Sequence, residues 1–136
     1  MEYKIIDLDD TQADEIECRL DEFDEKHITY RIPGTVKIGV MSNDILIAGV
    51  VAYMTAYRIL YVNTVYVEEE YRNMKIGTNL MNEVEKRARE IGANMIRLDT
   101  FNWQGRDFYR SLGYEEVGFY ENKEDGFSEY FFVKRI

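Results

Sequence analysis

A strand, a loop, a helix and a second strand follow one another in the middle of the chain, and this order constrains the fold more than any other feature. Residues 60–67 are dense in β-branched and aromatic side chains and contain neither glycine nor proline, which predicts a strand. Over residues 76–91 apolar side chains recur at helical spacing, and Gly92 follows where a helix would end. Residues 94–100 predict the second strand. A helix that joins two strands in this way places them parallel in one sheet, so we expect an α/β fold.

The loop that enters this helix, residues 72–78 (Arg-Asn-Met-Lys-Ile-Gly-Thr), is suited to bind an anion. The first N–H groups of a helix have no partner within the helix, and the peptide dipoles add roughly half a positive charge at that end. Gly77 lets the backbone approach a ligand closely, while Arg72 and Lys75 add positive charge. The loop therefore predicts a pyrophosphate site. The alternative is an ordinary amphipathic helix that begins with basic and small residues.

The rest of the chain supplies further strands and two more helices. Thr11, followed by acidic residues, predicts a helix start, and Ile16, Leu20 and Phe23 form the inner stripe of that helix. We expect strands at residues 3–7, 36–41, 45–57, 114–120 and 127–133, a hairpin turn at 42–44, and a short helix at 104–112. The 136 residues, of which 46% are hydrophobic, suffice for one domain over residues 1–136 with a sizeable core.

Charge argues against one class of partner. The chain has 26 acidic and 17 basic residues, which give a formal net charge of −9. Nucleic-acid binding relies on lysine and arginine side chains that neutralise phosphates, so we expect no nucleic-acid partner. A cationic substrate suits this charge better. An anionic cofactor then needs a local basic spot, and Arg72 with Lys75 provides one.

Other features set the expected compartment and exclude some chemistry. No apolar run approaches the roughly 20 residues that cross a bilayer, and the first residues lack the basic and apolar order of a signal peptide. We therefore expect a cytoplasmic protein with no membrane partner. Cys18 is the single cysteine and His27 the single histidine. We accordingly expect no internal disulfide, no histidine-based triad and no metal site.

A second informative segment follows the second strand. Residues 102–114 (Asn-Trp-Gln-Gly-Arg-Asp-Phe-Tyr-Arg-Ser-Leu-Gly-Tyr), taken with the loop at 72–78, resemble the GNAT superfamily of acyl-CoA-dependent N-acyltransferases. In that family a strand leads to Arg/Gln-x-x-Gly-x-Gly/Ala at a helix start, and Phe-Tyr-x-x-x-Gly-Phe/Tyr comes later. Arg72 and Gly77 match the first motif, residues 108–114 match the second, and the likeness runs from about Ile45 to the C-terminus. It implies a single GNAT-like α/β (α+β) domain, with a mixed central sheet of roughly six to seven strands flanked by about four helices.

The resemblance also implies a cofactor and its site. Acetyl-CoA would place its pyrophosphate on the N–H groups of residues 72–78 and its pantetheine arm along the backbone of residues 65–67, where a main-chain N–H near Val67 could polarise the thioester carbonyl. Asn102 would contact the arm, or would instead cap the helix at Gln104. Tyr109 would be the general acid for the thiolate. The cofactor-binding residues expected on this basis are Val65, Tyr66, Val67, Arg72, Asn73, Met74, Lys75, Ile76, Gly77, Thr78, Asn102 and Tyr109.

The chain departs from the family pattern at two places. Many relatives carry a glutamate on the central strand as general base, whereas residues 62–65 (Val-Asn-Thr-Val) contain no carboxylate. The candidates for the general base are water held by Asn63 or Thr64 and an acidic residue such as Glu22 or Asp24. The sequence does not decide between them. Lys75 stands where glycine is usual. If that backbone position needs a positive φ or very close approach of the ligand, Lys75 costs about 1 kcal/mol in strain or weakens cofactor binding; otherwise its ammonium adds to the binding of phosphate.

Two function classes follow. The first is an N-acetyltransferase that moves acetyl from acetyl-CoA to a primary amine of a small molecule or peptide. It would act by direct attack in a ternary complex, because no cysteine or serine is placed as a covalent carrier. The alternative is a non-catalytic acyl-CoA-binding sensor or partner module, which the missing carboxylate and Lys75 suggest. The resemblance is compatible with a homodimer.

Overall fold

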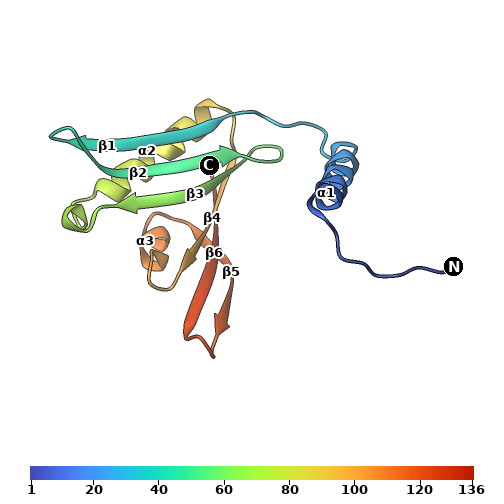
Figure 1. The fold of residues 1–136 in the computed structure, drawn as a ribbon. Coiled ribbons are helices and arrows are strands. Elements are labelled where there is room, and N and C mark those ends of the chain that lie inside the picture. Colours follow the sequence, from blue (N-terminus) through green and yellow to red (C-terminus); the bar gives the residue numbers. More distant parts are fainter. The chain divides into compact units, whose positions relative to one another are not determined.

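The computed structural model describes all 136 residues and divides into two compact units, Met1–Tyr30 and Arg31–Ile136. The first unit contains one helix, α1 (Asp10–Glu25) (Figure 1). A capping box begins it: the Gln12 main-chain N–H donates to Asp9 Oδ1 at 2.8 Å, and the Asp9 main-chain N–H donates to Gln12 Oε1 at 3.1 Å. These reciprocal bonds explain why α1 begins before the predicted Thr11.

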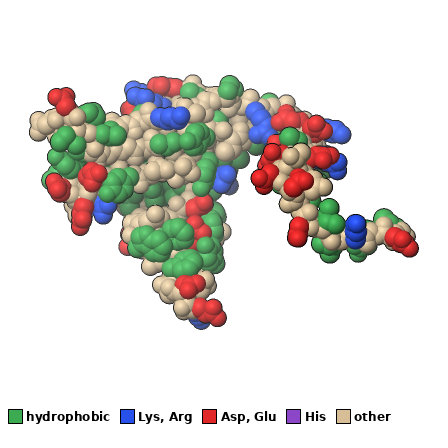
Figure 2. Space-filling view, in the orientation of Figure 1, with side chains coloured by type: hydrophobic (Ala, Val, Ile, Leu, Met, Phe, Trp, Pro, Cys, Tyr) green, Lys and Arg blue, Asp and Glu red, His purple; other side chains and the backbone are tan.

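Two expectations for the first unit are wrong. Residues 3–7 form no strand, because the unit holds no other strand with which they could pair. Ile16, Leu20 and Phe23 do not form a buried stripe but are 50%, 58% and 57% exposed. Figure 2 shows many acidic side chains gathered over this helix. No helix of the chain combines the length and apolar character that a membrane span requires.

The second unit is built on one mixed sheet of six strands in the order β1-β2-β3-β4-β6-β5. Neighbouring strands are antiparallel except β3 and β4, which are parallel and are joined through α2, as the order of elements predicted. The strands are β1 (Thr35–Ser42), β2 (Ile45–Met54), β3 (Ile59–Val67), β4 (Met95–Phe101), β5 (Glu115–Asn122) and β6 (Phe127–Arg135). The helices are the 3-10 turn η1 (Glu69–Tyr71), α2 (Ile76–Glu90) and α3 (Arg106–Ser111).

Turn geometry sets several boundaries. Asn43 and Asp44 both have positive φ, 49° and 64°, which suits the two-residue connection of the β1–β2 hairpin. The strand predicted to run to residue 57 ends at Met54, and Tyr57 has a φ of 56° that no strand adopts. The helix predicted from Gln104 begins at Arg106, because the Gln104 side chain instead accepts a hydrogen bond from the Phe101 N–H at 2.7 Å.

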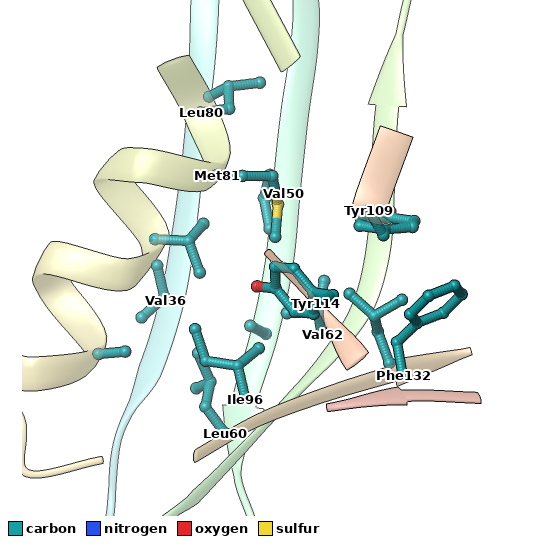
Figure 3. Packing of buried hydrophobic residues seen from close by; sticks show 14 of the residues in the cluster. Val36, Val50, Leu60, Val62, Leu80, Met81, Ile96, Tyr109, Tyr114 and Phe132 are labelled. Carbon is teal, nitrogen blue, oxygen red and sulfur yellow. The ribbon is translucent and has the colours of Figure 1, made fainter. Parts of the chain in front are cut away.

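The core lies between the sheet and α2, with α3 on the same face. Side chains alternate along a strand, so Val50 and Ala52 of β2, Leu60 and Val62 of β3, and Ile96 and Leu98 of β4 are buried under the helices. An irregularity in the β2–β3 pairing interrupts the alternation beyond Val62. Figure 3 shows Leu80 and Met81 of α2 near strand residues such as Val50, with Tyr109 of α3 and Phe132 of β6 completing the cluster. Burial of each large apolar side chain contributes about 1.5–3 kcal/mol. This packing fixes α2 and α3 relative to β3 and β4.

Candidate active site

The parallel strands β3 and β4 separate before they end. Their pairing runs from Ile59 beside Met95 to Val62 beside Leu98 and then stops, although β3 continues to Val67. A cavity of about 920 Å³ lies at this opening. Its lining includes most of the residues that the sequence predicted for the cofactor: Val65, Tyr66, Val67, Arg72, Asn73, Lys75, Ile76, Gly77, Thr78 and Tyr109.

The backbone of β3 faces this opening at two residues. The Glu68 N–H donates to the Ile47 carbonyl at 2.8 Å, so the main-chain groups of Glu68 and Tyr66 point toward β2. Those of Val65 and Val67, which alternate with them, point the other way. The Arg72 Nε agrees with this direction, since it donates to the Val67 carbonyl at 2.9 Å. The N–H groups of Val65 and Val67 are therefore directed toward the cavity.

The start of α2 forms another wall of the cavity. The first helical hydrogen bond runs from the Asn79 N–H to the Lys75 carbonyl at 3.0 Å, and no side chain caps this end. The N–H groups of Ile76, Gly77 and Thr78 consequently have no partner within the helix. All three residues line the cavity. This end of α2 has the unpaired donors and the positive dipole end that suit a pyrophosphate.

Lys75 has a left-handed backbone, with φ 64° and ψ 13°. This observation decides between the two alternatives for that position in favour of backbone strain, because a residue with a side chain adopts this conformation at a cost. Glycine would adopt it freely. Lys75 nevertheless lines the cavity at the start of α2.

Replacement of Lys75 by glycine should stabilise the protein by about 1 kcal/mol, equivalent to a rise in Tm of about 3 to 5 °C. The matched control is Lys86→Gly inside α2, which removes the same charge but should cost about 1 kcal/mol because the helical backbone there needs no positive φ. Thermal unfolding of the two variants measures both effects. An unchanged or lower Tm for Lys75→Gly would show that this residue is not strained.

Two glycines leave room for aromatic rings of α3: Gly77 at the start of α2, and Gly105 at the start of α3 itself. A Cβ at Gly77 would lie 3.2 Å from the ring of Phe108, and a Cβ at Gly105 would lie 3.1 Å from the ring of Tyr109. Both distances are shorter than ordinary van der Waals contact, so neither position accepts a side chain without movement of the ring. Phe108 packs against the core. Gly77 is thus required for packing, in addition to any close approach of a ligand.

Tyr109 combines burial with access to the cavity. Its side chain is only 7% exposed, and its ring lies 5.7 Å from the ring of Tyr114 and 6.1 Å from that of Phe132. Burial raises the pKa of the Tyr109 hydroxyl to about 12, because the phenolate loses hydration inside the protein. The hydroxyl is therefore protonated at neutral pH and has a proton to donate.

Two predicted residues lie apart from the cavity. Met74 is 61% exposed and is not among the residues that line it. The side-chain oxygen of Asn102 accepts a hydrogen bond from the Ser128 N–H at 2.9 Å, which ties the end of β4 to β6. Asn102 also lies outside the lining, so the structure does not bring it together with the other residues. Its alternative role as a helix cap is wrong, because Gly105 is the N-cap of α3.

Sequence reasoning missed Asp99. It is the only carboxylate residue among those that line the cavity, and its Oδ2 accepts a hydrogen bond from the Tyr61 hydroxyl at 3.0 Å. Burial, followed by this hydrogen bond, raises the pKa of Tyr61. The alternation of Asp99 with apolar neighbours along its strand could have singled it out. Of the acidic residues considered from the sequence, Glu22 and Asp24 belong to the first unit.

Comparisons with known proteins agree with this arrangement. A family model described as the acetyltransferase (GNAT) family matches residues 3–114. The crystal structure of an acetyltransferase from Bacillus cereus ATCC 14579 is 26% identical, with a TM-score of 0.90 and coverage of 98% of both chains. An acetyltransferase structure from Bacillus anthracis str. Ames in complex with acetyl coenzyme A has the same fold at 19% identity, with a TM-score of 0.69 over 76% of this chain and 64% of that one.

Similarity to a curated protein is confined to part of the chain. Thialysine N-epsilon-acetyltransferase from Bos taurus is 32% identical over 62 residues, which is 44% of this chain and 36% of that protein. The same protein from Sus scrofa is 31% identical over an alignment of equal length. The chain therefore spans about a third of the length of the curated relatives it matches.

Proposed function

Because the chain belongs to the acetyltransferase (GNAT) family, whose members use acetyl-CoA as acyl donor, we propose that it acetylates a primary amine of a small molecule or peptide by direct attack in a ternary complex. The observation that carries this proposal is the convergence on one cavity of the open start of α2, the outward N–H groups of β3 and the buried Tyr109.

The residues present fit acetyl-CoA. The unpaired N–H groups of Ile76, Gly77 and Thr78, with Arg72 and Lys75 beside them, would hold the pyrophosphate. The main-chain groups of Val65 and Val67, which face away from β2, would pair with the amides of the pantetheine arm, as a neighbouring strand would. When bound, acetyl-CoA supplies an acyl thioester whose carbonyl carbon accepts the amine.

The protein then has three tasks at the thioester. The Val67 N–H polarises the carbonyl from a fixed position. The Tyr109 hydroxyl donates a hydrogen bond to the leaving sulfur and passes its proton as the C–S bond breaks. The third task is to place the amine beside the carbonyl. No cysteine or serine lines the cavity, which supports direct attack over a covalent acyl-enzyme.

The acceptor proposed here is a cationic amine. The formal net charge of −9 attracts positively charged molecules and raises their concentration near the surface. The partial similarity to thialysine N-epsilon-acetyltransferase adds support, since the name of that relative describes acetylation of an ε-amine. Both small amines and lysine-like side chains of peptides fit this description.

Calorimetry and a turnover assay together test the proposal. We expect acetyl-CoA to bind the purified protein with measurable heat, and a panel of primary amines to include at least one that releases free CoA thiol faster than the amine-free control. Absence of heat would contradict the cofactor site. Binding without turnover of any amine would favour the alternative, a non-catalytic acyl-CoA sensor.

A further inference from the structure

The cavity reaches both faces of the sheet at the point where β3 and β4 separate. On β4, Leu98 and Thr100 are each 2% exposed and point toward the helices. Asp99 lies between them, so its side chain emerges on the opposite face, yet it lines the same cavity as Tyr109. A molecule on the helix face and another on the opposite face can therefore meet within the gap.

The surroundings of Asp99 on that face are aromatic. The Tyr61 hydroxyl binds one carboxylate oxygen at 3.0 Å and leaves the other oxygen free to accept further hydrogen bonds. The indole ring of Trp103, which also lines the cavity, stacks on the ring of Phe101 at 4.6 Å. A carboxylate beside aromatic faces is a favourable environment for an ammonium group, which gains both charge pairing and cation–π attraction.

Further charges on this face belong to Glu129 and Arg97. Glu129 pairs in register with Phe101 and accepts a hydrogen bond from the Tyr120 hydroxyl at 2.6 Å, which places a second carboxylate on the same side of the sheet as Asp99. The Arg97 guanidinium lies over the Tyr61 ring at 4.3 Å. The Tyr61 ring is thus already in contact with one cation, that of Arg97. Asp99, in contrast, lines the cavity.

We propose that Asp99 binds the ammonium group of the acceptor, a primary aliphatic amine that enters from the face of the sheet opposite α2 and α3. This assignment rests on the proposed function and supplies the carboxylate that β3 lacks. It also gives the two substrates separate entrances: acetyl-CoA would bind at the start of α2 on the helix face of the sheet, and the amine would enter from the opposite face. The matching substrate class is an amine that is positively charged at neutral pH.

Proton balance follows from this placement. The bound ammonium gives one proton to Asp99, which passes it to water, and the free electron pair on nitrogen then forms the N–C bond. The C–S bond breaks, and Tyr109 gives its proton to sulfur. The second amine proton leaves the new amide nitrogen and restores Tyr109 through water. The net products are the acetylated amine, free CoA thiol and one released proton.

The variant Asp99→Asn tests the assignment, because it keeps the size of the side chain and removes its charge. We expect kcat/KM for a charged amine to fall about tenfold to a hundredfold, with the affinity for acetyl-CoA unchanged. Asp99→Glu should recover part of the loss. Asp125→Asn, in the turn between β5 and β6, removes the same charge outside the cavity and should leave kcat/KM within about twofold.

A weakly basic amine separates ammonium binding from a structural role. Such an amine is already uncharged at neutral pH, so the loss in Asp99→Asn should shrink to about threefold or less. An equal loss for both amines, a loss of acetyl-CoA binding, or full activity of Asp99→Asn would each overturn the assignment while leaving the proposed function intact. A wild-type protein that binds no acetyl-CoA, or binds it and acetylates no amine, would overturn both.

Discussion

Replacement of Tyr109 by phenylalanine should lower kcat at least about tenfold and leave the affinity for acetyl-CoA unchanged. In the proposed mechanism the hydroxyl meets the leaving sulfur only as the C–S bond breaks, so its removal should affect the transition state more than ground-state binding. Because burial raises the pKa of Tyr109 to about 12, the loss should be constant from neutral pH to about pH 10. Release of free CoA thiol gives the rate, and calorimetry gives the affinity.

Tyr114→Phe is the matched control for this variant. Tyr114 is as buried as Tyr109 and packs against its ring, but it does not line the cavity. Its hydroxyl has no hydrogen-bond partner, so its removal should keep the rate within about twofold and leave stability equal or slightly higher. Equal rates in Tyr109→Phe and the wild type would remove Tyr109 from the reaction.

Replacement of Phe132 by alanine should destabilise the second unit by about 3–5 kcal/mol. Phe132 is 1% exposed and lies opposite Leu98 of β4, where its ring also supports that of Tyr109. Truncation removes apolar contact and leaves a cavity that the surrounding strands fill only in part. Denaturant unfolding followed by tryptophan fluorescence, or by circular dichroism, measures the change in free energy.

Phe119→Ala provides the comparison for Phe132→Ala. Phe119 is 58% exposed and stacks on Tyr130 at 6.0 Å, so its truncation should cost no more than about 1.5 kcal/mol. If both variants lost the same stability, the core would not be centred on Phe132. If Phe132→Ala lost less than about 2 kcal/mol, the neighbouring side chains would have to close the space left by the ring.

The parts of the fold that sequence predicted are those with strong local patterns. The β-branched run at β3 is compatible only with a strand, and the apolar spacing at α2 is compatible only with a helix. The family prediction is confirmed by the match over residues 3–114. The strand predicted at residues 3–7 failed because pairing depends on a distant partner that no local pattern reveals. One domain over the whole chain, a cytoplasmic location and a homodimer stay predictions.

The candidate site was predictable where it depends on main-chain groups. The order of a strand, a loop and a helix suffices to place the N–H groups at the start of α2 beside β3, whatever the side chains are. Asn102 and Asp99 show the limit. The Asn102 side chain accepts a hydrogen bond from the main chain of Ser128, which is 26 residues further along the chain. Asp99 lies beside the cavity because β3 and β4 separate just before it. Local sequence shows that Asp99 alternates with its strand neighbours, but it reveals neither the main-chain partner of Asn102 nor the point where β3 and β4 separate.

The contacts of Gly77 and Gly105 with successive aromatic rings carry a consequence for how such an enzyme diversifies. A side chain gained at Gly77 would displace Phe108, and one gained at Gly105 would displace Tyr109, so either change would disturb the lining of the proposed acetyl-CoA site. Evolutionary drift is consequently restricted on the helix side of the sheet. New acceptor preferences would arise more readily by changes around Asp99 and Glu129, where side chains can be exchanged without moving Tyr109.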